Sequence, residues 1–217
     1  MKANLKALTS ISVLAVALAA CGDKAPAPAD SGKKADKPAA GGKADAATEE
    51  AGLKIEDPNY DHNVAVGDMA FLWKVDGESL KVKLAAKTTG WVAVGFNPTP
   101  GEGMKGANFV LAYVKDGQAA AEDHFGAVKT NHKPDDKLEG QSNVTEVAGK
   151  EEGGVTEVSF AIPLKSGDDK DTDIDPAGDT TVMLAWGKTD ALILKHKFYA
   201  SLSVNLTSGE HNVLVSK

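Results

Sequence analysis

Short apolar segments that alternate with turn signals are the feature that most restricts the fold of this chain. The segment MAFLWKV (69–75) precedes Asp76 and Gly77, and LKVKLAA (80–86) follows them. Two such runs joined by an Asp-Gly pair are typical of a β-hairpin. Five further runs of this kind follow: WVAVGF (91–96), NFVLAYV (108–114), VTEVSFAI (155–162), TVMLAW (181–186) and KFYASLSVNL (197–206).

Turn-forming residues are frequent between these runs, and no segment shows a sustained helical period. A second Asp-Gly pair occurs at 116–117, and the chain contains 22 glycines. Many short strands at this spacing favour an antiparallel, immunoglobulin-like β-sandwich. Residues 52–217 are numerous enough to bury a substantial core, and they contain no internal boundary. We therefore predict one all-β domain over residues 52–217.

The first 20 residues have the pattern of an export signal. Lys2 and Lys6 precede the apolar run ISVLAVALAA (11–20), which ends in LAAC at Cys21. This ending resembles the lipobox of bacterial lipoproteins. Acylation of Cys21 with more than one chain is expected to anchor the protein to a bacterial membrane, extracytoplasmically, on the periplasmic face or at the cell surface. The alternative is that Cys21 is an ordinary residue after a cleaved signal.

Residues 21–51 consist mainly of Ala, Lys, Pro, Gly and Asp and contain no aromatic residue. Such a segment cannot bury enough apolar surface to offset the entropy of ordering its backbone. We interpret it as a lipidated, flexible linker that holds the following domain tens of ångströms from the membrane.

Charge and cysteine content exclude several classes of function. The chain has a net charge of −7, and loss of Lys2 and Lys6 with the signal lowers it to −9. An acidic chain without arginine is a poor candidate for nucleic-acid or phosphate binding. Cys21 is the only cysteine, so an intrachain disulfide, a cysteine-rich metal site and covalently attached haem are all excluded.

The acidic segment SGDDKDTDIDPAGDT (166–180) resembles a calcium loop because its aspartates alternate. However, it lacks the glycine at the sixth position and the closing glutamate of an EF-hand loop. We therefore interpret it as a solvated acidic loop.

Four of the five histidines have no distinctive sequence context. His62 is expected at the surface, and His211 is expected to start a last edge strand. His124 and His132 lie in EDHFGAVKTNHKPDD, a polar segment that we expect to be a loop. They could share a metal there, although histidines in loops are often exposed without such a role.

His196 differs because of its position in an alternating pattern. In the segment 192–206, every second residue is apolar except His196, so a continuous strand would place this ring on a buried face. A bulge within the segment would change the alternation. A buried imidazole needs a partner, since an unpaired buried polar group costs about 1–3 kcal/mol. That partner could be a backbone carbonyl, a serine or a metal.

Met104 stands among polar and glycine residues in GEGMKGANFVLAYV (101–114). A thioether and a neutral imidazole can hold a haem iron from opposite sides, and a glycine-flanked loop allows the backbone to approach a flat macrocycle. Met104 and His196 are therefore candidate ligands of a haem. The alternative is that Met104 fills a gap at the open end of the sandwich.

Two segments resemble the DOMON domain, and in particular its b-type cytochrome branch, typified by the haem domain of cellobiose dehydrogenase. They are GWVAVGFNPTPGEGMKGANFVLAYV (90–114) and VMLAWGKTDALILKH (182–196), and the similarity extends over residues 60–206. This resemblance implies a β-sandwich with one non-covalent haem b. By match to the family pattern, Met104 and His196 are the axial ligands.

The resemblance also implies which residues surround the haem. Its candidate pocket residues are Trp91, Phe96, Lys105, Gly106 and Phe198. Since the chain has no arginine to bind the haem propionates, Lys105, Lys195 or Lys197 could supply point charges instead.

Two filled axial positions leave no site for a substrate, so the resemblance implies an electron carrier and no enzyme. An acidic surface would suit a basic redox partner, and a tethered domain could move between donor and acceptor. A second hypothesis is a DOMON module that binds a sugar or another small ligand, with Trp91, Trp186 or Tyr113 as stacking surfaces. A third is a copper-binding lipoprotein that uses Met104 and His196, or the pair His124 and His132.

Overall fold

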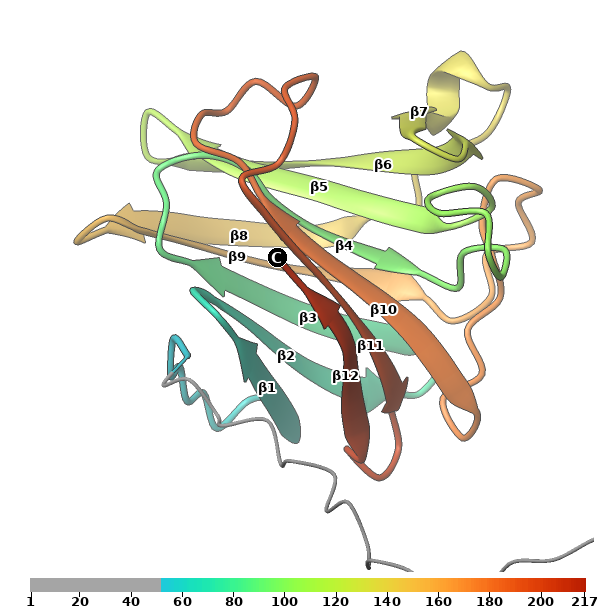
Figure 1. Ribbon diagram of the computed structural model, residues 1–217, viewed down its shortest axis with the longest axis horizontal. Helices are drawn as coiled ribbons and strands as arrows, with labels where there is room; N and C mark the ends of the chain where they lie inside the picture. The colour runs from blue at the N-terminus through green and yellow to red at the C-terminus, as the bar shows by residue number, and fades with distance from the viewer. Residues whose placement is uncertain (1–51) are drawn as a thin grey trace, which may run out of the picture. The chain divides into compact units, whose positions relative to one another are not determined.

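The computed structural model describes residues 52–217, which form two antiparallel sheets packed face to face (Figure 1). The five-stranded sheet contains, in spatial order, β1 (His62–Val66), β2 (Met69–Asp76), β3 (Ser79–Ala86), β9 (Val155–Pro163) and β8 (Thr145–Glu152). The seven-stranded sheet contains β12 (His211–Ser216), β11 (Phe198–Asn205), β10 (Asp179–Trp186), β4 (Val92–Phe96), β5 (Asn108–Lys115), β6 (Gln118–Val128) and β7 (Asn131–Pro134). A short 3₁₀ helix, η1 (Asp135–Lys137), follows β7. The signal peptide, Cys21 and the linker predicted for residues 1–51 lie outside the described residues.

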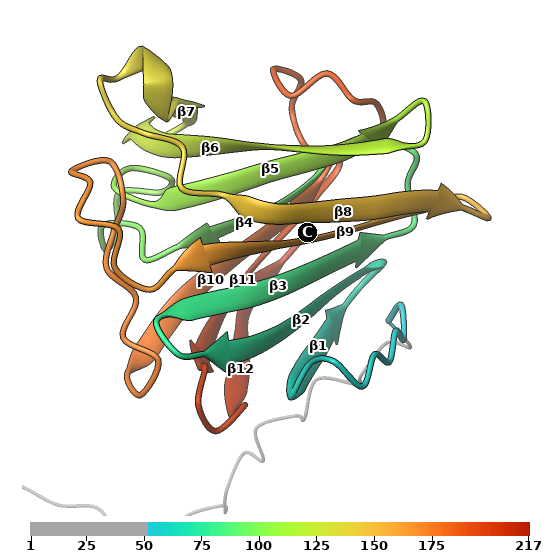
Figure 2. The same ribbon diagram turned by 180° about the vertical axis from the view of Figure 1, so that it is seen from behind.

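The predicted antiparallel β-sandwich is confirmed, and a hairpin turn lies at each Asp-Gly pair, formed by Gly77 and Glu78 in the first and by Asp116 and Gly117 in the second. β2 pairs with β3 across the first turn, and β5 pairs with β6 across the second. Asp116 and Gly117 both have positive φ angles, 52° and 76°, as a two-residue turn between twisted strands requires. The first of these hairpins lies in the five-stranded sheet, which faces the viewer in Figure 2.

Four strands were not predicted from the sequence, namely β1, β6, β7 and β8. All residues of β8 are exposed, so this edge strand has no alternation of apolar and polar residues. β6 and β7 replace the loop that we expected around His124 and His132. His211 does begin β12, which is the edge strand of its sheet, as predicted.

The core lies between the two sheets and contains the inward-facing residues of both. Trp73 is fully buried there and stacks on Phe71, with ring centroids 4.8 Å apart. Its indole Nε1 donates a hydrogen bond to the Leu206 carbonyl at 3.0 Å. In β4, Val92, Val94 and Phe96 face this core. Within residues 52–217, no helix is long and apolar enough to cross a membrane.

Candidate functional site

A cavity of about 1090 Å³ lies on the outer face of the seven-stranded sheet, the side away from the core. Ligand pockets in proteins usually measure about 300–1,000 Å³, so this one has room for a large ligand. Its floor is apolar and comes from β4, β5 and β10 together with the residue that precedes β4. These floor residues are Trp91, Ala93, Phe109, Leu111, Met183 and Ala185.

β5 is apolar on both faces, which explains why the sheet has a second apolar surface. Val110, Ala112 and Val114 face the core, whereas Phe109 and Leu111 belong to the outer cluster. A strand with apolar residues on both faces needs a cover on each side. The continuous apolar run NFVLAYV is therefore the sequence signal for a second apolar surface at this strand.

Met104 reaches the cavity from the loop between β4 and β5, residues 97–107. Backbone hydrogen bonds fix this loop on β6 and on the turn that follows it. The Met104 amide donates to the Lys129 carbonyl at 3.0 Å, and the Gly106 amide donates to the Gly126 carbonyl at 2.8 Å. The backbone of Met104 is therefore held in place at the edge of the cavity.

Gly126 makes this close approach possible. A Cβ atom at this position would lie 1.8 Å from the Met104 carbonyl oxygen, which is a backbone atom that cannot rotate away. We expect Gly126→Ala to lower the free energy of unfolding by about 1–3 kcal/mol, because the loop must move to accommodate the methyl group. Urea denaturation measures this change.

The matched control is Gly178→Ala, because the nearest atoms to its added Cβ belong to the Asp175 side chain, at 3.2 Å and beyond. A side chain can rotate away, so we expect a change within about 0.5 kcal/mol. Equal effects of the two substitutions would show that the contact between Gly126 and Met104 is unimportant.

His196 reaches the cavity from the loop between β10 and β11, residues 187–197. This loop and the Met104 loop lie at opposite ends of β4 (Figure 1). The Gly187 amide donates to the Trp91 carbonyl at 2.9 Å, and the Lys197 amide donates to the Trp186 carbonyl at 2.8 Å. These bonds hold both ends of the loop against the sheet.

The alternating pattern placed His196 wrongly, although the residue does line the cavity. β11 begins only at Phe198, so the alternation holds from there to Leu206 and does not extend to His196. A continuous strand would have turned the ring toward the core between the sheets. The loop instead brings it to the outer face, where its centroid lies 5.0 Å from that of the Tyr199 ring.

The environment of His196 favours the neutral form of its imidazole. Burial lowers the pKa of His196, and the nearby charge of Lys195 lowers it further. Within residues 52–217, neither ring nitrogen of His196 makes a hydrogen bond. A neutral imidazole without a partner retains a nitrogen lone pair for a metal.

The structure brings together three of the predicted site residues, because Trp91, Met104 and His196 all line the cavity. The prediction for Phe96 and Phe198 is wrong. Phe96 is fully buried in the core with Val92 and Val94, which share its parity on β4. Phe198 packs against the same core and stacks on Trp186, with centroids 6.3 Å apart.

The remaining predicted residues divide between the cavity and its surroundings. Lys195 lines the cavity, whereas Lys105, Gly106 and Lys197 are not among its lining residues. Gly106 acts in the loop backbone, where its carbonyl accepts a hydrogen bond from the Thr172 hydroxyl at 2.6 Å. A second lysine, Lys129, lines the cavity and was not predicted.

His124 and His132 also line the cavity, which contradicts their expected place in an exposed loop. His124 lies on β6 and is only 4% exposed, and His132 lies on β7. Their Nδ1 atoms are 2.9 Å apart, and His124 Nε2 lies 3.2 Å from a Glu122 carboxylate oxygen.

Both histidines of this pair are poor bases in the folded protein. Burial, followed by the neighbouring His124 ring, lowers the pKa of His132 to about 4. Burial also lowers the pKa of His124, and Glu122 only partly offsets this effect. The cavity therefore holds three neutral imidazoles, those of His124, His132 and His196, of which the sequence pattern singled out one.

Two buried polar atoms at the cavity have no hydrogen-bond partner among the described residues, namely Trp91 Nε1 and Asp190 Oδ1. Of the aromatic residues considered as sugar-stacking surfaces, Trp91 and Tyr113 line the cavity, and Trp186 does not. The apolar floor, the thioether and the neutral imidazole together fit the chemistry of a haem. The positive charges of Lys129 and Lys195 at the cavity would suit the two carboxylates of a haem.

Comparison with known proteins places this sandwich in a family. Residues 66–187 match the sequence model of the DOMON domain family. The chain is similar to the cytochrome b domain of pyranose dehydrogenase from Coprinopsis cinerea, with 11% identity and a TM-score of 0.48 over 68% of this chain and 77% of that chain. It is also similar to the cytochrome domain of Myriococcum thermophilum cellobiose dehydrogenase, with 13% identity and a TM-score of 0.42 over 64% and 68%. No curated protein matches the chain.

Proposed function

Because this chain belongs to the DOMON domain family, we propose that it is a b-type cytochrome in which Met104 and His196 hold one non-covalent haem. The observation that carries this proposal is that both residues line one cavity, although they come from loops at opposite ends of β4. A haem bound there would supply one-electron transfer.

Each of the two residues has the chemistry that this role requires. The Met104 sulfur is a soft, neutral donor on a loop that backbone hydrogen bonds hold in place. The His196 ring is neutral because burial lowers its pKa. Two protein ligands leave no open position for a substrate, so the role is electron transfer without catalysis. A thioether ligand also tends to raise the reduction potential.

The surrounding residues would exclude water and balance charge. Trp91, Phe109 and Leu111 form an apolar floor that is almost completely buried. Lys129 and Lys195 line the same cavity and could pair with the propionates as point charges.

The proposal extends to the place and partners of the protein. Acylation at Cys21 would anchor it to the extracytoplasmic face of a bacterial membrane, and residues 21–51 would act as the tether. The net charge of −9 that remains after loss of Lys2 and Lys6 with the signal would favour a redox partner with a basic surface.

The difference spectrum of the reduced and oxidised protein tests this function most directly. We expect protein produced with sufficient haem to show a Soret band, and sharp α and β bands after reduction with dithionite. Protein that stays colourless when haem is supplied, during expression and again after purification, would overturn the proposal.

The Met104→Ala variant tests the sulfur ligand. We expect it to retain haem through His196 but to bind carbon monoxide when reduced, because one axial position then lacks a protein ligand. The shift of the Soret band under carbon monoxide measures this. Met183→Ala is the matched control, because Met183 is another thioether that lines the cavity. A carbon monoxide complex in that control, and none in Met104→Ala, would identify Met183 as the ligand.

A cuprous-ion site is a second candidate function, favoured by the 2.9 Å approach of His124 and His132 within a cavity that also contains methionines. Imidazole and thioether are both suitable ligands for Cu⁺. Protein that binds copper stoichiometrically, loses it on His132→Ala and takes up no haem would favour this function over the cytochrome.

A further inference from the structure

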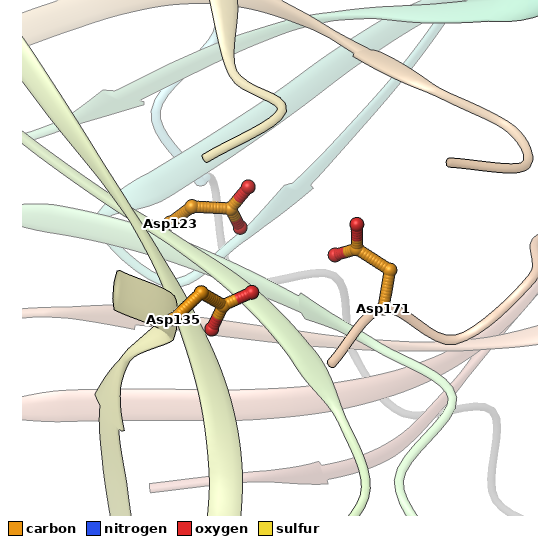
Figure 3. Close-up of side chains that lie close together, drawn as sticks. All are labelled: Asp123, Asp135 and Asp171. Atoms are coloured by element: carbon orange, nitrogen blue, oxygen red, sulfur yellow. The ribbon is translucent and has the colours of Figure 1, made fainter. Parts of the chain in front are cut away.

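Three aspartate carboxylates converge beside β6 (Figure 3). Asp123 directly precedes His124 on this strand and so points to the opposite face from His124, which lines the cavity. Asp123 lies on β6, Asp135 begins η1, and Asp171 lies in the loop between β9 and β10. One oxygen of each carboxylate lies within 4.8 Å of the others. Asp123 is 4% exposed and Asp135 is 1% exposed, so these are not ordinary surface acids.

The carboxylates leave several oxygens without a partner. Among residues 52–217, no donor reaches Asp123 Oδ1, Asp171 Oδ1 or either oxygen of Asp135. The other oxygens of Asp123 and Asp171 are both bound by Asn143, through its backbone amide and its side-chain amide, each at 2.7 Å. Asn143 therefore orients two of the carboxylates and leaves one oxygen of each available.

An independent observation comes from Asn108 on β5. Its side chain is 95% buried, since the residue is only 5% exposed, and its Oδ1 atom also has no partner among the described residues. Asn108 faces the same side of the sheet as Asp123, because Asn108 pairs with Phe125, and Val110 pairs with Asp123. The Asn108 side chain also lowers the pKa of Asp171, which places its amide near this carboxylate.

Such a group is unfavourable without a positive charge. A buried carboxylate without partners must be neutralised or paired with a cation. Burial raises the pKa values of Asp123 and Asp135 to about 7, and the neighbouring aspartates add to the rise. Lys170 lowers the pKa of Asp135, but this effect is smaller than those of burial and of the neighbouring aspartates.

We propose that the three aspartates and the Asn108 amide oxygen form a binding site for one hard divalent cation, with Ca²⁺ as the best fit. All of these donors are oxygens, which Ca²⁺ and Mg²⁺ prefer over the softer metals. Ca²⁺ binds oxygens at about 2.3–2.6 Å, so two of its ligands can lie up to about 5 Å apart. Mg²⁺ requires nearly ideal octahedral geometry and usually keeps several of its waters, so a group of four protein oxygens suits Ca²⁺ better.

The charges of the three aspartates and the segments that carry them are both consistent with a cation that stabilises the fold. Three carboxylates exceed the charge of one Ca²⁺ by a single unit, and water can complete its six to eight ligands. The cation would join β6, η1 and the acidic loop, which are separate in the sequence. Asp171 is only partly solvated, since its Oδ1 atom is buried, whereas Asp169 and Asp173 are exposed, as expected for a solvated acidic loop.

Thermal unfolding and calorimetry of the full chain, after treatment with EDTA and dialysis, test this site. We expect one Ca²⁺ to bind per chain. At a free Ca²⁺ concentration of about 100 times Kd, Tm should rise by roughly 5–10 °C for a domain of this size. Mg²⁺ at the same concentration should produce a smaller shift.

The Asp135→Asn variant should bind Ca²⁺ at least about 10-fold more weakly and lose most of the rise in Tm. Asp169→Asn is the matched control, because it removes the same charge from an exposed position two residues from Asp171, and it should respond as the unmodified protein does. Asp171→Asn provides a second test should Asp135→Asn fail to fold. Absence of Ca²⁺ binding to the unmodified protein, or an equal response of Asp135→Asn and Asp169→Asn, would overturn the proposal.

Discussion

His196→Ala should be isolated with about one tenth or less of the haem that the unmodified protein contains. Substitution of a residue that only hydrogen-bonds to a metal ligand commonly lowers metal affinity by about 10–100-fold. Loss of a ligand itself should therefore lower the affinity at least as much. The remaining Met104 thioether is a weak, neutral donor that cannot hold the iron alone. The pyridine haemochrome assay, divided by protein concentration, measures this ratio.

His211→Ala is the matched control, because His211 is exposed at the start of β12 and does not line the cavity. His132→Ala distinguishes the two sources of an imidazole in the cavity. Retention of haem by His196→Ala, combined with its loss from His132→Ala, would assign the nitrogen ligand to the pair of His124 and His132.

Trp73→Ala should have the largest effect on stability among single substitutions in the core. Trp73 is fully buried, stacks on Phe71 and donates to the Leu206 carbonyl. Replacing a buried tryptophan with alanine usually costs about 3–5 kcal/mol, because a large cavity remains. This is a large share of the roughly 5–15 kcal/mol that stabilises a typical domain. Urea denaturation of the two proteins measures the difference.

Trp73→Phe separates the two contributions of this side chain. It keeps an aromatic ring against Phe71 but leaves the Leu206 carbonyl without its donor, which costs about 1–3 kcal/mol. We expect it to be clearly more stable than Trp73→Ala. Equal stability of the two variants would mean that filling the space between the sheets contributes little at this position.

The fold was more predictable than the site, and β4 and β5 show why. The run WVAVGF identified a strand, but placing Phe96 in the pocket ignored its parity with Val92 and Val94. Parity within a regular strand is local information, so this mistake was avoidable. The apolar outer face of β5 was likewise visible in NFVLAYV. The strand β8 was not visible, because all of its side chains are exposed.

The positions of residues in loops were the part of the structure that the sequence predicted least well. The glycine-rich segment around Met104 could be recognised, because such a loop before an apolar strand is a local pattern. The place of His196 could not be derived from alternation, since the chain leaves the strand geometry before Phe198. His124 and His132 were assigned to a loop because a polar strand next to a cavity has no distinctive sequence pattern.

By itself, the sequence determined the all-β class, the hairpins at both Asp-Gly pairs and the candidate pair of Met104 and His196. These follow from patterns within short segments, or from resemblance to a family. Only the tertiary structure decided that Met104 and His196 line one cavity with two further histidines, and that Asp123, Asp135 and Asp171 converge beside β6. The physical reason is that such groups depend on packing between segments far apart in the chain, whereas alternation and turn chemistry act over a few residues.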